Sequence, residues 1–229
     1  MTIPKGFIMK YARKSLTLRR KSDNIITMSD TYYTIQAPSE SVTREKMSRF
    51  LAFAFSVSSA DEAKSHIAAL SKRYHDARHV CWAYMLGSDR SLSLSSDNGE
   101  PSGTAGKPIL GQINSLGLTD IVVIVVRYFG GIKLGTSGLI AAYREAARSC
   151  LAAAEIVERH DMAHISFTFP YMSMNDVMKI VKGGDVKILS QVFDNSCAME
   201  IEVRADDETT LRGRLGNIDG LTMHDSTQA

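Results

Sequence analysis

Two short polar segments combine glycines with charged side chains, a combination suited to holding an anion. The first reads DNGEPSGTAGKP at residues 97–108, and the second reads VVRYFGGIKLGTSG at residues 125–138. Glycine lets the backbone bend sharply and come close to a ligand, because no Cβ intervenes. Each segment runs into a predicted helix, whose first N–H groups and partial positive charge favour anions. We therefore predict an anion-binding site built from these segments.

Residues of both segments are candidates for binding the ligand. They are Asp97, Glu100 and Lys107 in the first segment, and Arg127, Tyr128, Gly130, Gly131, Lys133, Gly135, Thr136 and Ser137 in the second. A glycine-rich loop before a helix can hold a phosphate group on its backbone N–H groups. The glycines could instead serve tight packing, and the Tyr128 ring could close a core instead of stacking on a base. The second segment is not a Walker loop, because no Gly-Lys-Ser/Thr sequence follows its final glycine.

Arg127 directly follows six β-branched residues, 121–126, which predict a strand covered on both faces. A guanidinium at the end of such a strand needs a carboxylate or an anionic ligand. Glu100 or Asp97 could be the internal partner, a phosphate could take that place, or both could hold together. The two acids could also bind a metal, since hard cations favour loop carboxylates, or could form a turn with the glycine between them.

A zinc site is the alternative for His75, His79 and Cys81. Their spacing offers three ligands at most, whereas a structural zinc site has four. Core packing is therefore favoured for these residues. We assign no metal, no cofactor and no catalytic residue.

The two segments, in this order and separated by an apolar strand-like stretch, closely resemble the sequence pattern of the YigZ/IMPACT family. The family usually has Asp-Asp-Gly-Glu at 97–100 and Gly-Thr-Gly-Gly at 135–138, where this chain has DNGE and GTSG. The first difference removes one possible carboxylate. The resemblance implies an N-terminal α+β domain with a ribosomal-protein-type fold, like the fourth domain of elongation factor G. It also implies a C-terminal ferredoxin-like domain and an association with the regulation of translation.

Strand and helix patterns alternate around the two segments. A capping-box signature, Ser59 to Glu62, begins a helix with an apolar stripe. A second helix is predicted over 106–116, and a third from an N-cap at Thr136 or Ser137 to about residue 154. Residues 38–46 are predicted as a loop. Strands are predicted over 32–35, 49–57, 80–86, 91–95 and 121–126.

Strict alternation of apolar and polar residues marks the C-terminal part. It occurs over 160–169 and 197–203, as expected for strands with one solvated face. With helices near 175–181 and 209–215 and strands at 186–193 and 221–223, the order is β-α-β-β-α-β, the ferredoxin-like arrangement. We therefore predict an α+β protein with an N-terminal domain over 29–159 and a ferredoxin-like domain over 160–229.

The positive charge of the chain lies at its N-terminus. Residues 1–28 contain seven Lys or Arg and one acid, whereas residues 29–159 hold 14 bases and 13 acids and the C-terminal part holds 6 and 11. A basic arm could bind nucleic acid. We instead expect residues 1–28 to be a disordered extension or an over-extended start, with Met28 as the initiator. An intact mass that begins at Met1 or Thr2 would contradict this expectation.

Three classes of function remain open. The favoured one is a translation-associated regulatory protein that binds RNA, the ribosome or a phosphate-bearing ligand through the glycine-rich loops. The alternatives are a metal-assisted enzyme acting on a phosphorylated small molecule and a protein–protein adaptor that uses the acidic C-terminal domain. Three widely spaced cysteines predict a cytoplasmic location. We expect no membrane span and no sequence-specific DNA binding.

Overall fold

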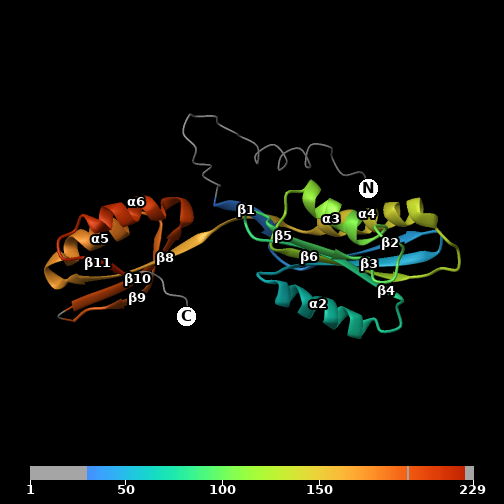
Figure 1. The fold of residues 1–229 in the computed structure, drawn as a ribbon, viewed down its shortest axis with the longest axis horizontal. Coiled ribbons are helices and arrows are strands. Elements are labelled where there is room, and N and C mark those ends of the chain that lie inside the picture. Colours follow the sequence, from blue (N-terminus) through green and yellow to red (C-terminus); the bar gives the residue numbers. More distant parts are fainter. Residues whose placement is uncertain (1–29, 195, 225–229) are drawn as a thin grey trace, which may run out of the picture. The chain divides into compact units, whose positions relative to one another are not determined.

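The computed structural model describes residues 30–194 and 196–224, so the expectations for residues 1–28 lie outside the described residues. The described chain forms two compact units (Figure 1). Unit 1 comprises residues 32–159, and unit 2 comprises residues 160–224 together with Asp30 and Thr31. Each unit has a hydrophobic core of its own.

A five-stranded antiparallel sheet forms the centre of unit 1. Its strand order is β2-β3-β6-β4-β5, and a separate pair joins β1 to β7. The central strand β6 is buried from Ile121 to Arg127, which confirms the prediction of a strand covered on both faces. The strands are β1 (Thr31–Ile35), β2 (Ser39–Glu45), β3 (Ser48–Ser56), β4 (His79–Leu86), β5 (Leu92–Ser96), β6 (Ile121–Tyr128) and β7 (Ile156–His160).

Helices cover both faces of this sheet. Helix α2 (Ala60–Arg73) lies on one face, and α3 (Gly106–Ser115) and α4 (Gly135–Ala153) lie on the other (Figure 1). The predicted N-cap at Ser59 is confirmed, since the Glu62 N–H donates to Ser59 Oγ at 3.2 Å, while the Glu62 carboxylate accepts from the Ser58 N–H at 2.7 Å and not from that of Ser59. Covering both faces explains why β6 contains only apolar residues until it reaches Arg127.

The loop predicted for residues 38–46 is wrong, because β2 occupies most of it and pairs with β3. Lys46 and Met47 join the two strands with φ angles of 43° and 69°, as a two-residue hairpin turn requires. The hydroxyl of Ser39 on β2 donates to the Cys150 carbonyl oxygen of α4 at 3.1 Å. Small polar side chains on β2 allow this close approach of α4, and they also gave the segment the composition of a loop.

Unit 2 has the ferredoxin-like arrangement that the alternation predicted. Its strand order is β11-β8-β10-β9, and its two main helices cover one face of the sheet (Figure 1). The α+β fold class is therefore confirmed. The elements are β8 (Met162–Pro170), the short helix η1 (Tyr171–Ser173), α5 (Met174–Lys182), β9 (Val186–Val192), β10 (Ser196–Arg204), α6 (Ala205–Gly216) and β11 (Thr222–His224).

Two general features complete the fold. All three cysteines are buried free thiols. Among the residues that the structure describes, no helix combines the length and the apolar character needed to cross a bilayer.

Candidate functional site: an anion pocket in unit 1

A buried ion pair lies where β6 ends. Arg127 Nη1 donates to Glu100 Oε1 at 2.6 Å, and the two side chains are only 7% and 4% exposed. Strand pairing places Arg127 between Phe50 of β3 and His79 of β4. Of the two acids considered as internal partners, Glu100 is therefore the one that holds the guanidinium.

Tyr143 of α4 extends this ion pair into a buried network. Its hydroxyl donates to the same Glu100 oxygen at 2.9 Å, and the Cys81 thiol donates to the Tyr143 hydroxyl at 3.3 Å. Burial raises the pKa of Cys81 to about 12 and raises the pKa of Tyr143 well above its usual range. Both groups thus remain protonated donors near pH 7, and they fix Glu100 in place. The sequence prediction did not include Tyr143.

One donor of Arg127 has no acceptor within the described residues. Its Nη2 lies 3.4 Å from Ser48 Oγ, but its Nε is buried and makes no hydrogen bond. A buried polar group left unpaired costs about 1–3 kcal/mol, so such groups normally have partners. Because the Nε atom is buried, solvent cannot satisfy this donor either.

The beginning of α4 also leaves donors without acceptors. Gly135 is the first residue of the helix and has a φ angle of 73°, and no side chain caps this end. The prediction of Thr136 or Ser137 as the N-cap is wrong, because the left-handed glycine lets the helix begin earlier. The first N–H groups of a helix have no intrahelical acceptor and carry a partial positive charge.

The beginning of α3 is different, because Asp97 already occupies it. The Asp97 carboxylate accepts hydrogen bonds from the N–H groups of Gly103, Ala105 and Gly106 at 2.7–2.9 Å. Burial alone would raise the pKa of Asp97, but these donors outweigh that effect, and the pKa is lowered. Lys107 adds a favourable charge nearby. Asp97 thus closes its loop onto α3.

A pocket of about 390 Å³ brings the Arg127 side chain and the start of α4 together. Its polar wall consists of Arg78, His79, Glu100, Arg127, Lys133, Gly135 and Thr136. A carbonyl oxygen can only accept, so the 2.9 Å contact of His79 Nδ1 with the Asn98 oxygen places a proton on Nδ1. The Nε2 atom is then left to act as an acceptor, or as a donor when the ring is charged.

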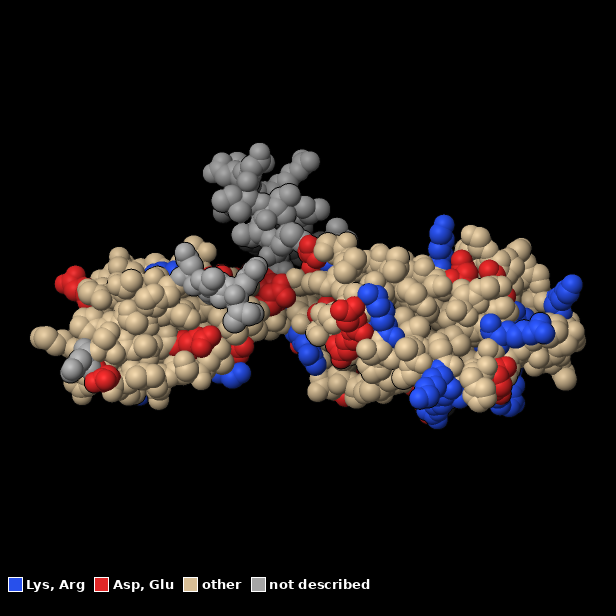
Figure 2. Space-filling model, turned by 60° about the horizontal axis from the view of Figure 1, so that its bottom comes forward, with Lys and Arg blue, Asp and Glu red and all other residues tan. Residues whose placement is uncertain are grey.

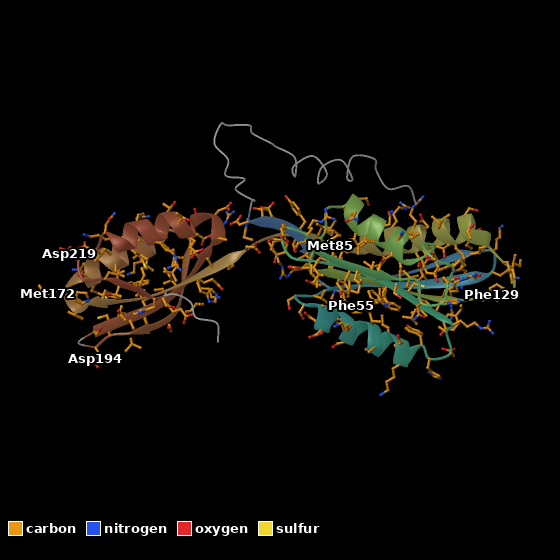
Figure 3. The ribbon with its side chains drawn as sticks, in the orientation of Figure 1. Phe55, Met85, Phe129, Met172, Asp194 and Asp219 are labelled. Carbon is orange, nitrogen blue, oxygen red and sulfur yellow. The ribbon has the colours of Figure 1, made fainter. Side chains whose placement is uncertain are left out.

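The remaining wall of the pocket is apolar. It consists of Pro101, Phe129, Leu134 and Leu139. Phe129 is 50% exposed, and its ring lies 5.6 Å from the Arg127 guanidinium carbon. Figure 3 shows Phe129 at the end of the sheet of unit 1. The pocket can therefore take a ligand that joins a charged group to a flat or apolar one.

The structure brings together five of the residues selected from the sequence. Glu100, Arg127, Lys133, Gly135 and Thr136 line the pocket. The other six are not part of the pocket wall: Asp97, Lys107, Tyr128, Gly130, Gly131 and Ser137. Sequence reasoning did not select Arg78, His79, Phe129 or the two leucines, because only strand pairing and helix packing place them beside Arg127.

Tyr128 and Gly130, like Asp97, have defined contacts outside the pocket wall. The Tyr128 hydroxyl donates to Asp76 at 2.7 Å, and the Arg49 guanidinium lies over the Tyr128 ring at 4.8 Å. Gly130 packs directly on the hairpin between β2 and β3, where a Cβ would collide with the Met47 backbone. Gly130 thus fixes the loop against the hairpin.

Exposed cations lie on both faces of the sheet at the end where β6 finishes, and we call this set the basic rim. It consists of Arg44, Lys46, Arg49, Arg73, Arg78 and Lys133. None of these six forms an ion pair with another described residue. Figure 2 shows Lys and Arg side chains gathered toward the right-hand end of unit 1, the end where Figure 3 labels Phe129. The exposed acids in this region are Glu45 and Asp76.

Metal binding finds little support in the described part of the chain. No group of three or more His, Cys, Asp or Glu side chains is arranged there to hold a metal ion. The sulfur of Cys81, one member of the considered zinc set, lies 2.9 Å from the Asp97 carbonyl oxygen, so its single S–H is shared between that oxygen and the Tyr143 hydroxyl. The pocket is lined by three cationic side chains, Arg78, Arg127 and Lys133, and one carboxylate, Glu100.

Comparison with known proteins agrees with the sequence pattern. A family model described as the Impact N-terminal domain matches residues 46–151. The IMPACT family member YigZ of Escherichia coli K12 is 32% identical over 171 residues, which are 74% of this chain and 84% of that protein. The IMPACT family member YvyE of Bacillus subtilis 168 is 39% identical over 132 residues, and these cover 58% of this chain and 61% of the relative.

A solved structure extends the likeness over nearly the whole chain. This crystal structure of a hypothetical protein aligns with a TM-score of 0.67 at 26% identity, and the alignment covers 88% of this chain and all of the other. The resemblance noted in the sequence is confirmed, and the chain belongs to the IMPACT family.

Proposed function

We propose that this protein is a translation-associated RNA-binding protein that holds its ligand at the pocket and basic rim of unit 1. The translational setting is the expectation attached to membership of the family. The RNA ligand is argued from the surface itself. The observation that carries the proposal is a set of exposed cations, unpaired within the described part of the chain, at the end of the sheet where Arg127 and the start of α4 line a pocket.

Charge is the first argument for RNA. Residues 29–159 hold nearly equal numbers of acids and bases, so any affinity for nucleic acid must come from a local patch. The basic rim is such a patch. Arginine side chains that lie over aromatic rings, as Arg49 lies over Tyr128, can pair with phosphates while the ring supports the guanidinium.

Aromatic exposure is the second argument. Phe129 presents half of its surface to solvent beside the cations. Aromatic side chains bordered by positive charge bind single strands, because bases stack on the ring and phosphates meet the cations. A single-stranded or unpaired RNA segment is therefore the form that we expect to bind.

The test is the binding of an internally labelled single-stranded RNA, measured by fluorescence anisotropy at several salt concentrations. The double variant Lys46→Gln/Arg49→Gln should bind more weakly, and its slope of log K against log salt should fall by about 1.4, at about 0.7 per phosphate contact. Lys64→Gln is the matched control, because Lys64 is exposed on α2 but paired with Asp61. No measurable RNA binding, or equal slopes for the double variant and the wild type, would contradict the proposal.

A further inference from the structure

We propose that the pocket recognises a terminal phosphomonoester of a nucleotide, so that unit 1 binds the end of a strand in preference to its interior. This inference rests on the proposed function, because it names the part of the RNA that enters the pocket. The shared chemistry is a phosphate carried by a single ester bond, next to a sugar and a base. A strand end and a free mononucleotide both present it.

The position of the free donors favours a group that enters the pocket. Arg127 lines the cavity with a side chain that is only 7% exposed, so an anion can meet its guanidinium only from inside the cavity. The N–H groups at the start of α4 border the same cavity, since Gly135 and Thr136 line it. A helix N-terminus and a guanidinium together form a strong receptor for a compact oxyanion. An internal phosphate carries a sugar on both sides, which hinders it from entering as far.

Charge also favours a monoester. The pocket holds three cationic side chains, Arg78, Arg127 and Lys133, and one carboxylate, Glu100. The excess of two positive charges matches a phosphomonoester, which carries about −1.5 to −2 at pH 7. A diester in a strand carries only one negative charge. The ion pair with Arg127 and the hydrogen bond from Tyr143 hold Glu100, which lessens its repulsion of the ligand.

The size and the apolar wall fit the remainder of a nucleotide. A cavity of about 390 Å³ lies near the lower end of the range for small-molecule sites, about 300–1,000 Å³. It can hold one nucleotide but not a run of them. Phe129, at the mouth, is placed to contact the base, while Leu134 and Leu139 lie beside the start of α4.

The experiment compares RNAs of one sequence that differ only in their ends. Binding of the full-length protein is measured by competition against an internally labelled RNA, with a 5′-phosphate, a 3′-phosphate, two hydroxyl ends or a closed circle as competitor. We expect one phosphorylated end to bind at least about tenfold more tightly than the hydroxyl-ended RNA, as one or two charge-assisted hydrogen bonds provide. The circle should bind like the hydroxyl-ended strand.

Two variants then locate the effect. Thr136→Asp places a carboxylate at the uncapped start of α4, where it favours the helix and competes with a phosphate. This variant should lose the preference for a phosphorylated end but should still bind hydroxyl-ended RNA. Ala141→Asp adds the same charge at an exposed position in the second turn of α4, outside the pocket lining, and should keep the preference.

Each outcome has a distinct meaning. Equal affinity for all ends, or a preference that survives in Thr136→Asp, would overturn this inference and leave the proposed RNA binding intact. Absence of binding to any RNA would overturn both. A nucleoside monophosphate that competes as well as the phosphorylated strand would support the phosphomonoester site and identify free nucleotide as the source of the ligand.

Discussion

Replacing Glu100 with Gln tests how the buried ion pair holds unit 1 together. The substitution keeps the volume and an acceptor for Tyr143 but leaves the Arg127 charge, 7% exposed, without its counter-charge. Breaking a buried pair by removing one partner costs about 3–5 kcal/mol. The pocket admits solvent to this pair, so we expect about 3 kcal/mol. If the free energy of unfolding falls by about 2 kcal/mol per M urea, the urea concentration at the unfolding midpoint should fall by about 1.5 M.

Trp82 provides a signal specific to unit 1. It is the only tryptophan in the sequence and lies on β4, stacked on Tyr84 with ring centroids 5.7 Å apart. Its fluorescence as a function of urea concentration therefore reports the unfolding of unit 1 and not that of unit 2. Glu145→Gln is the control, because it removes the same charge from an exposed pair with Arg148 and should cost at most about 0.5 kcal/mol.

A double variant separates the cost of leaving a buried charge unpaired from other effects of the substitution on packing. Adding Arg127→Met to Glu100→Gln removes both charges, and replacing a buried pair by apolar groups is often close to neutral. The double variant should recover to within about 1 kcal/mol of the wild type. If Glu100→Gln lowers the free energy of unfolding by no more than Glu145→Gln does, the buried ion pair does not stabilise unit 1 as its burial implies.

Three further predictions concern other contacts. Gly130→Ala should lower the stability of unit 1 by about 1–3 kcal/mol, measured by urea unfolding, because its Cβ collides with the Met47 backbone. Asp97→Asn should cost about 1–2 kcal/mol at pH 7. Because the folded-state pKa of Asp97 is lowered, the stability that its carboxylate contributes is lost as pH falls through that pKa. The difference in free energy of unfolding between Asp97→Asn and the wild type should therefore disappear in acid. Asp30→Ala, which removes a two-bond pair with Arg204 at 2.8 and 3.0 Å, should speed amide exchange in β10; unchanged exchange would count against that contact.

The sequence located the buried guanidinium but not all of its surroundings. A run of β-branched residues ending at Arg127 carried enough information to predict a covered strand and a need for a counter-charge. It could not decide between Asp97 and Glu100, because that depends on how the first loop closes onto α3. Tyr143, His79 and Phe129 meet Arg127 only through strand pairing and helix packing, which local patterns do not encode.

The missed strand β2 has a different cause. Its inward positions hold serine and threonine, whose small polar side chains give no apolar alternation to detect. The alanines of α4 let the helix backbone pack closely on these small side chains, and Ser41 Oγ donates to the Ala146 carbonyl oxygen at 3.4 Å. Tertiary packing thus overrode composition there, as is common for edge strands.

The pairing of β1 with β7 has a consequence for biosynthesis. The Tyr33 hydroxyl donates to Glu158 across 125 positions of the chain, and the Gln36 N–H donates to the Glu155 oxygen. The earliest described strand therefore acquires its partner only after nearly the whole of unit 1 has left the ribosome. Contacts of such long sequence separation form slowly, and domains generally fold as units during synthesis. A nascent chain that stalls before residue 156 would thus carry β1 without its strand partner β7, although its contacts with residues 118–120 could form.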